Sequence, residues 1–344
     1  MNLNPQQLAT ALEAFLAQRM PLLVTGAPGI GKSDIIAAAA KLAGFDLIIS
    51  HPAVSDPTDF KGLPWPDATK KSAGFIPFGE FHHALTATRP TAWFFDDLGQ
   101  ASVAVQAACM QLFLARRVNG HILPDCIVFV GATNRRGDRA GVNGILETVK
   151  SRFDSIVELE PDIDSWCNWA FGHNIPPTMI AFLRYRPELL SKFIPSADLV
   201  NSPSPRTWSA AARIEALNLS AAIELPLMAG AVGEGAATEY LVFRKMVASL
   251  INLDAILKDP DKAAIPTAPD QLYATAVGLA AKANGQNFAR IAVYCNRLID
   301  SQHGEFAVLC IRDAVRKDEK LTYTDTFVRL ASGPVGNLIS GNVN

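Results

Sequence analysis

The sequence predicts an α/β protein in which a parallel sheet is covered by helices on both faces and is followed by an all-helical second half. Short apolar runs without polar alternation recur through the first 160 residues, and segments with helical character separate them. Strands buried on both faces are uniformly apolar, and the helices that connect parallel strands cover the two faces of the sheet. After Pro161 the strand signal ends, and helix-like segments alternate with prolines.

The order of the elements follows from local signals along the chain. A helix precedes the first strand, because Asn4-Pro5 is a typical helix start and apolar residues follow at helical spacing. Strands are expected at 22–25, 46–49, 92–95, 126–130 and 155–159. Further helices are expected at 33–43, 103–117 and 142–153, and near 272–280, 291–299 and 306–315 in the C-terminal part.

The composition argues against several classes of protein. The 344 residues include 31 Lys and Arg against 33 Asp and Glu, and the absence of a basic run argues against nucleic-acid binding. The longest purely apolar run, 35–40, is far shorter than the roughly 20 residues that cross a bilayer, and the N-terminus lacks the features of a secretory signal. We therefore expect a soluble, cytoplasmic protein with no membrane partner.

The five cysteines are scattered and form no CxxC pair, which predicts reduced, mostly buried thiols.

A glycine-rich loop between the first predicted strand and the next helix carries the clearest functional signal. The pattern GxxxxGK[ST] is matched by Gly26, Ala27, Pro28, Gly29, Ile30, Gly31, Lys32 and Ser33. Glycines let backbone N–H groups turn toward the phosphates of a nucleotide, and the N-terminus of the following helix favours the same negative charge. Lys32 is expected to reach the terminal phosphates and Ser33 to coordinate Mg²⁺. The loop therefore predicts ATP and Mg²⁺ as the cofactors.

Two later strands end in polar residues that suit the same chemistry. The apolar run 93–95 leads into Asp96 and Asp97, and the run 128–132 leads through a threonine into Asn134. Asp96 is expected to hold Mg²⁺ through water, and Asp97 to orient the water that attacks the γ-phosphate. Asn134 is expected to hydrogen-bond the γ-phosphate or that water. Acids that only cap the strand and open the next helix remain the alternative for Asp96 and Asp97.

The order of the motifs points to one family. The loop, the acidic strand end and the strand-terminal Asn134 are followed by Lys150-Ser151-Arg152-Phe153 and by Pro203-Ser204-Pro205-Arg206-Thr207-Trp208. Together these motifs resemble those of AAA+ ATPases, and most closely the MoxR group with its CbbQ, NorQ and GvpN relatives, over about residues 3–214. The resemblance implies an AAA+ core of the P-loop NTPase fold, in which Asn134 is sensor 1, Arg152 is the arginine finger and Arg206 is sensor 2. In such rings the nucleotide lies between neighbouring subunits, so Arg152 would act on the ATP of the adjacent subunit.

Other interpretations of the arginines stay open at this point. Arg152 also fits a cation that complements the dipole at a helix C-terminus. Arg135, Arg136 and Arg139 directly follow the sensor strand and compete for the role of the finger. Arg206 is harder to explain as a dipole partner, because a cation is disfavoured where a helix begins.

The resemblance also implies the domain organisation and the partners. We expect a nucleotide-binding domain over 1–160 with an insert at about 51–90, a helical lid over 161–258 and a C-terminal helical extension over 259–344. The insert resembles the helix-2 insert of the MoxR group, a small hairpin that faces the ring pore or its substrate. Lys61, Lys70 and Lys71 would then meet a partner, although a solvated loop fits them equally well. The expected assembly is a homo-oligomeric, hexameric ring, and the expected partners are a von Willebrand factor A domain protein and a protein client.

The leading hypothesis is therefore a ring ATPase that remodels or activates a partner protein in a chaperone-like manner. The chain departs from the family in having Asp96-Asp97 where Asp-Glu is usual. A positioning error of about 1 Å can cost around a hundredfold in rate. Slow turnover is thus expected, raised by Asp97→Glu and abolished by Asp97→Asn. The alternatives are a DNA-associated AAA+ motor or loader, and a scaffold that binds ATP and assembles but hydrolyses it weakly.

Overall fold

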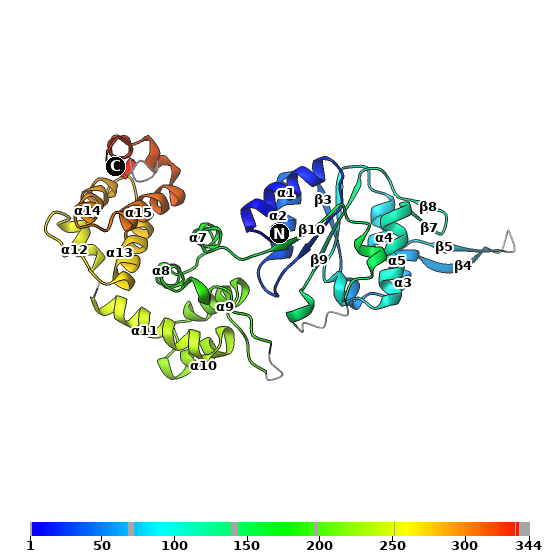
Figure 1. Cartoon of the computed structure of the whole chain (residues 1–344), viewed down its shortest axis with the longest axis horizontal. Helices are drawn as coiled ribbons and strands as arrows, with labels where there is room; N and C mark the ends of the chain where they lie inside the picture. Colours follow the sequence, from blue (N-terminus) through cyan, green and yellow to red (C-terminus); the bar gives the residue numbers. More distant parts are fainter. Residues whose placement is uncertain are drawn as a thin grey trace. The chain divides into compact units, whose positions relative to one another are not determined.

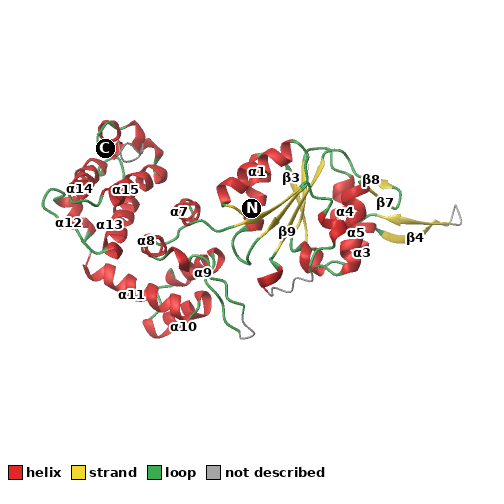
Figure 2. Ribbon diagram, in the orientation of Figure 1, coloured by secondary structure: helices red, strands yellow, loops and turns green. Residues whose placement is uncertain are grey.

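The computed structural model describes residues 2–67, 72–138, 144–195, 199–250, 252–333 and 335–336. They form two compact units. The first unit holds the residues up to Asp162 and a segment that starts at Phe193, and the second holds the remainder. Figures 1 and 2 show the sheet-containing first unit and the helical second unit. Among the residues so described, no helix combines the length and the apolar character that crossing a bilayer requires.

The first unit is built on a six-stranded parallel sheet. Its strands are β1 (Asn2–Leu3), β2 (Leu22–Thr25), β3 (Asp46–Ser50), β6 (Thr91–Phe95), β9 (Ile127–Thr133) and β10 (Ser155–Leu159). Their order in the sheet is β1-β10-β2-β9-β6-β3, and every neighbouring pair is parallel. The five strands predicted from the sequence are confirmed, whereas β1 is too short to leave a pattern. Because β9 lies between β2 and β6, the residues that follow these three strands meet at one edge of the sheet.

Helices cover both faces of this sheet, as the pattern of buried residues requires. One layer consists of α1 (Pro5–Ala17) and α2 (Lys32–Leu42), and the other of α3 (Pro57–Lys61), α4 (Gly79–Leu85), α5 (Val103–Ala115) and α6 (Glu147–Lys150) (Figure 1). Leu22 and Val24 pack into the core under α1 and α2, and Leu23 between them packs into the core on the opposite face. Successive side chains of a strand point to opposite faces, so an uninterrupted apolar run is what a strand between two helical layers needs. The predicted fold class is confirmed.

An antiparallel hairpin projects from the segment between α3 and α4. It consists of β4 (Leu63–Asp67) and β5 (Ser72–Ile76), paired from Leu63 with Ile76 to Asp67 with Ser72. Its side chains are largely exposed, including 61% of Trp65. The segment at 51–90 therefore contains a small hairpin, and its correspondence to a helix-2 insert stays a prediction. Lys70 and Lys71 lie outside the described residues.

A second, shorter hairpin was not predicted. It consists of β7 (Arg117–Val118) and β8 (His121–Ile122), joined by Asn119 and Gly120, whose φ angles are 48° and 88°. The expected helix to Arg117 is wrong in its last two residues, because α5 ends at Ala115. Asn-Gly is among the strongest short hairpin signals, since both residues tolerate positive φ, and it could have revealed this turn.

The short hairpin contacts both the longer hairpin and α3, the helix that precedes it. The side-chain amide of Asn119 donates to the carbonyl of Lys61 at 2.9 Å, and Nε2 of His121 lies 2.8 Å from the carbonyl oxygen of Phe75. The short second hairpin therefore supports the base of the longer one.

The helix expected at 142–153 is also wrong for most of its length. Residues 142 and 143 lie outside the described part of the chain, and only Glu147–Lys150 form a helix, α6. The chain then turns so that Phe153 packs into the core with Val149, and β10 starts two residues later. Burial of these two apolar side chains overrides the helical pattern.

The second unit is helical throughout its described residues. Its α-helices are α7 (Ile163–Phe171), α8 (Pro177–Tyr185), α9 (Pro205–Glu215), α10 (Ala221–Val232), α11 (Glu234–Leu250), α12 (Leu253–Lys258), α13 (Pro269–Lys282), α14 (Phe288–Asp300), α15 (Gly304–Lys317) and α16 (Asp325–Ala331). The three C-terminal helices predicted from the sequence are confirmed as α13, α14 and α15. One apolar core runs from α7 to the end of the described chain.

The segment between α12 and α13 is held against α14. Arg297 donates to the carbonyl oxygens of Pro260 at 2.6 Å and Ala263 at 2.8 Å, and the Tyr294 hydroxyl donates to that of Ala264 at 2.8 Å. The domain boundaries expected at 161 and 259 stay predictions. Within the second unit, residues on both sides of 259 share one core.

A buried ion pair crosses this core, and breaking it is expected to destabilise the second unit. Arg184 of α8 forms a two-pronged pair with Asp313 of α15, whose side chain is fully buried. Asp313→Asn would leave the guanidinium buried without its counter-charge, which typically costs about 3 kcal/mol. We expect a loss of that size in the free energy of unfolding, measured by urea denaturation. Asp164→Asn, which removes the partly exposed pair with Arg312, is the control and should change stability by less than about 1 kcal/mol. Equal effects of the two variants would contradict the prediction.

The thiols are mostly buried, as predicted. All five cysteines are free, and only Cys126 is partly accessible. Burial raises the pKa of Cys167 to about 12 and also raises the pKa of Cys109. Because the thiolate is the reactive form, we expect buried thiols to resist an aromatic disulfide reagent at pH 8 until the protein is denatured. Cys126→Ser should remove the rapid phase of labelling, and a rapid phase that persists would show that a buried thiol becomes exposed.

Candidate active site

The predicted phosphate loop connects β2 to α2 in a conformation that needs glycine. Gly31, the residue before α2, has a φ of 95°, in the left-handed region that glycine adopts most readily. A side chain at Gly26 would lie 2.8 Å from the carbonyl oxygen of Leu159 and 2.6 Å from Ile30. The backbone thus approaches β10 closely before turning into the helix, whose first N–H groups have no partner within the helix.

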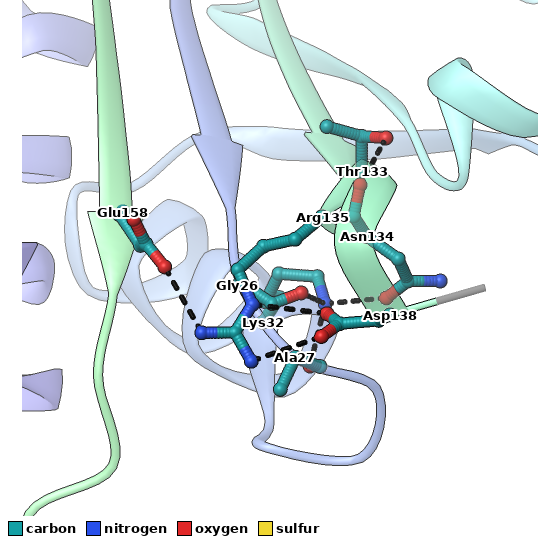
Figure 3. Close-up of polar contacts among 8 residues, drawn as sticks. All are labelled: Gly26, Ala27, Lys32, Thr133, Asn134, Arg135, Asp138 and Glu158. Atoms are coloured by element: carbon teal, nitrogen blue, oxygen red, sulfur yellow. Dashed lines mark hydrogen bonds and ion pairs between the residues drawn. The ribbon is translucent and has the colours of Figure 1, made fainter. Parts of the chain in front are cut away.

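Lys32 is held at the centre of this loop. Its side chain is buried, and its Nζ donates to the carbonyl oxygens of Gly26 at 2.9 Å and Ala27 at 3.0 Å. It also donates to Oδ1 of Asn134 at 2.8 Å, which joins the loop to the end of β9 (Figure 3). The sequence-predicted lysine and sensor asparagine are therefore in direct contact.

The same hydrogen-bonded network includes the other predicted residues at this edge. Ser33 Oγ donates to Oδ2 of Asp96 at 2.7 Å, and Oδ1 of Asp96 accepts the backbone N–H of Asp97 at 3.0 Å. The side-chain amide of Asn134 donates to Oδ1 of Asp97 at 3.2 Å. Lys32, Ser33, Asp96, Asp97 and Asn134 come from three separate parts of the sequence, and the strand order brings them together.

Asp97 has an unusual backbone conformation. Its φ and ψ are 55° and 34°, in the left-handed helical region. Among residues other than glycine, Asp and Asn are several-fold enriched in that region because their short side chains tolerate it. The sharp turn after β6 directs the Asp97 carboxylate toward Asn134, and it gives a physical reason for aspartate at this position.

The residues present fit a magnesium ion that is bound together with a nucleotide. The described residues include no group of three or more His, Cys, Asp or Glu side chains arranged to hold a metal ion by themselves. Mg²⁺ at a nucleotide site uses one or two protein oxygens, and phosphates and water complete its octahedron. Ser33 Oγ and the Asp96 carboxylate, already in contact, are oxygen ligands of that kind.

Arg135 is held by carboxylates of its own chain. Its Nε and one terminal nitrogen donate to the two oxygens of Asp138, both at 3.0 Å, and the other terminal nitrogen donates to Glu158 at 3.2 Å (Figure 3). These interactions, first of all the hydrogen bond to Asp138, raise the pKa of Arg135. Asp138 and Glu158 were not singled out in the sequence. The i, i+3 spacing of Arg135 and Asp138 could have suggested the ion pair between them. The contact between Arg135 and Glu158 depends on strand order, which the sequence does not show.

Arg152 lies at the opposite edge of the sheet from the phosphate loop of its own chain. It precedes β10, whose first residue, Ser155, pairs with Leu22 at the start of β2. The phosphate loop follows the other end of β2, about 13 Å along the strand. Nε of Arg152 is buried with no hydrogen-bond partner among the described residues, and a terminal nitrogen donates to Ser151 Oγ at 3.3 Å.

The remaining candidate arginines lie elsewhere. Arg206 is exposed in the first turn of α9, in the second unit. Ser204 caps this helix, and its Oγ accepts the N–H of Thr207. Arg136 is exposed after β9, and Arg139 lies outside the described residues. The role of Arg206 as sensor 2 stays a prediction.

Comparisons with known proteins give similarity to solved structures only. No protein-family profile matches the sequence, and no curated protein is significantly similar to it. RuvB, the Holliday junction branch migration motor of Thermotoga maritima, is 15% identical with a TM-score of 0.40, and the match covers 86% of each chain. NtrX from Brucella abortus is 12% identical with a TM-score of 0.42, and the match covers 79% of this chain and 67% of that one.

The first unit is a parallel α/β sandwich with a phosphate-loop motif between β2 and α2. The parallel sheet has the strand that ends in Asn134 between the phosphate-loop strand and the acidic strand. This arrangement accounts for the contacts that surround Lys32.

Proposed function

We propose that this chain is a MoxR-type AAA+ ATPase that binds and hydrolyses Mg-ATP at the subunit interfaces of a hexameric ring and thereby remodels or activates a partner protein. The observation that carries the proposal is the network around Lys32. A cationic side chain, a hydroxyl, two carboxylates and an amide meet at the mouth of a glycine-rich loop. Those are the groups that phosphoryl transfer needs, because its catalysis consists almost entirely of positioning and charge stabilisation.

Each of these groups has a distinct role in the proposed reaction. Lys32 binds the terminal phosphates after leaving the carbonyl groups that it now contacts. Ser33 and Asp96 hold Mg²⁺, which when bound neutralises charge on the phosphate oxygens. Asp97 accepts a hydrogen bond from the attacking water and orients it, and Asn134 fixes the Asp97 carboxylate.

The position of Arg152 supports a site that is completed between subunits. On its own chain, Arg152 is at the amino edge of the sheet, whereas the loop is at the carboxyl edge. A guanidinium so placed is available to a nucleotide bound by a neighbouring copy. Arg135, in contrast, is paired within its own chain, which favours Arg152 as the finger.

The hairpin of β4 and β5 is the proposed contact for a protein client. Its exposed apolar side chains include Leu63 and Trp65, and exposed apolar groups that cluster on a projecting element are typical of protein contacts. A von Willebrand factor A domain protein is the proposed bridge between ring and client. This partner is proposed from the motif resemblance alone.

The proposed function is tested by steady-state ATP hydrolysis with Mg²⁺ over a wide range of protein concentrations. We expect specific activity to climb steeply with concentration, because dilution separates the subunits that complete each site. Lys32→Ala removes the cation that binds the phosphates and serves as the blank for contaminating activity.

The other outcomes have definite meanings. Activity that does not depend on concentration would contradict a site shared between subunits. Tight ATP binding with no hydrolysis above the Lys32→Ala blank would contradict the ATPase and favour the ATP-gated scaffold. Stimulation of hydrolysis by DNA would favour a DNA-associated motor over a protein remodeller.

A further inference from the structure

Arg135 forms a strap across the sheet at the base of the phosphate loop. It follows β9, and it reaches Glu158 in β10. The strand between β9 and β10 is β2, which leads into the loop. The side chain of Arg135 therefore passes over the end of β2, as Figure 3 shows.

The register of the sheet places this strap just before the loop begins. Thr25, the last residue of β2, is paired with Thr133 of β9 on one side and with Glu158 of β10 on the other. Gly26 follows Thr25 directly, so Arg135 ties together the two strands that flank the first residue of the loop. Thr133, Thr25 and Glu158 thus lie side by side on β9, β2 and β10, and Arg135 spans them where the chain leaves β2 for the loop.

The strap is anchored at both ends by charge. Asp138 is 8% exposed and accepts two hydrogen bonds in a bidentate geometry, which is the strongest arrangement for an arginine and a carboxylate. The third hydrogen bond goes to Glu158. All three nitrogens of the Arg135 guanidinium therefore donate to acceptors in its own subunit.

Arg135 directly follows Asn134, a residue of the candidate active site. Asn134 contacts both Lys32 and Asp97, and the residue after it fixes the direction in which the backbone leaves β9. If Arg135 were released, the end of β9 would be free to move relative to β10 and the loop. A displacement of about 1 Å in such a group can cost around a hundredfold in rate.

We propose that Arg135 is a positioning residue that holds Asn134 and the base of the phosphate loop in register by bridging Asp138 and Glu158. This inference rests on the proposed function, since it assigns Arg135 a part in nucleotide binding and hydrolysis. It also gives Arg135 a role within its own subunit, in place of a role as a finger for a neighbour.

The test is a double-mutant cycle of Arg135→Ala and Glu158→Gln with three measurements. Affinity for a fluorescent ATP analogue, kcat for ATP and the thermal midpoint without nucleotide are determined for each protein. We expect Arg135→Ala to lower kcat about tenfold or more and to weaken nucleotide binding by a smaller factor. Glu158→Gln alone should have a weaker effect, and the double variant should be no worse than Arg135→Ala, because the two residues act through one contact.

Two further variants separate positioning from general stability. Arg135→Lys keeps one charge contact and should restore part of the lost kcat. Arg89→Ala removes an exposed ion pair with Asp46, at the start of β3 and away from the loop, and should leave kcat and affinity unchanged. A merely structural role for Arg135 would lower the thermal midpoint without changing kcat or affinity.

Several results would overturn the proposal. They are an Arg135→Ala protein whose kcat and affinity are within twofold of the original, and additive effects of Arg135→Ala and Glu158→Gln. Failure of the proposed function is recognised separately, because the original protein would then show no hydrolysis above the Lys32→Ala blank. In that case the cycle on nucleotide affinity decides on the strap by itself: coupled losses support it, and unchanged affinity overturns it.

Discussion

Arg152→Ala is expected to lower kcat by about a thousandfold or more while leaving nucleotide affinity within a few-fold. An arginine that neutralises charge on the transferring phosphoryl group contributes 10³–10⁵ in rate, and it acts mainly in the transition state. The measurement is steady-state hydrolysis at saturating ATP together with titration of a fluorescent ATP analogue. Lys150→Ala is the matched control, because Lys150 belongs to the same segment but pairs with Glu147.

Mixing two inactive variants tests whether Arg152 acts on a neighbouring subunit. Lys32→Ala subunits lack a working loop but carry Arg152, and Arg152→Ala subunits have the reverse defect. A site formed by an Arg152→Ala loop next to a Lys32→Ala neighbour contains both groups, so the mixture should regain activity that neither protein shows alone. A mixture as inactive as its components, or an Arg152→Ala protein with normal kcat, would assign Arg152 the alternative role of a cation near the C-terminus of a short helix.

Asp97→Asn is expected to reduce hydrolysis by about a hundredfold or more without loss of ATP binding. The amide cannot accept a proton or hold the attacking water as a carboxylate does, and groups in that role contribute 10²–10⁴ in rate. Asparagine tolerates the left-handed backbone of position 97 as well as aspartate does, so the fold should be unaffected. Hydrolysis and ATP binding are measured on the same preparations, with the thermal midpoint as the control for folding.

Asp97→Glu is the informative companion of that variant. The side chain is one methylene longer and restores the Asp-Glu pair that is usual in the family the motifs resemble, and we expect faster hydrolysis than in the original protein. It also places a residue less suited to positive φ at that turn, so the thermal midpoint should fall. Equal rates for the Asp, Glu and Asn proteins would remove Asp97 from the mechanism.

Local sequence signals were sufficient for five of the six strands and for the loop. The central strands β2, β6 and β9 are mostly buried apolar runs, which favour a parallel strand covered on both faces, and the loop glycines have backbone angles that other residues avoid. The strand ends at Asp96, Asp97 and Asn134 were recognised because a polar residue after an apolar strand is visible without knowledge of the fold. The short hairpin at Asn119-Gly120 was missed although its signal is local, because the helical pattern before it was continued too far.

Contacts between distant parts of the chain were decided by the tertiary structure alone. The sequence could not show that Glu158 faces Arg135 across β2, because that depends on the order β10-β2-β9 and on the register of three strands. It left Arg135, Arg136 and Arg139 as competitors of Arg152 for the role of the finger. Pairing of Arg135 with Asp138 and Glu158, and the placement of Arg152 at the other edge of the sheet, support the proposal that Arg152 is the finger. Short-range patterns predict helices and strands because these elements depend on the backbone preferences of each residue and its near neighbours. The partners of a charged side chain depend instead on how distant segments pack, and no local pattern in the sequence specifies that packing.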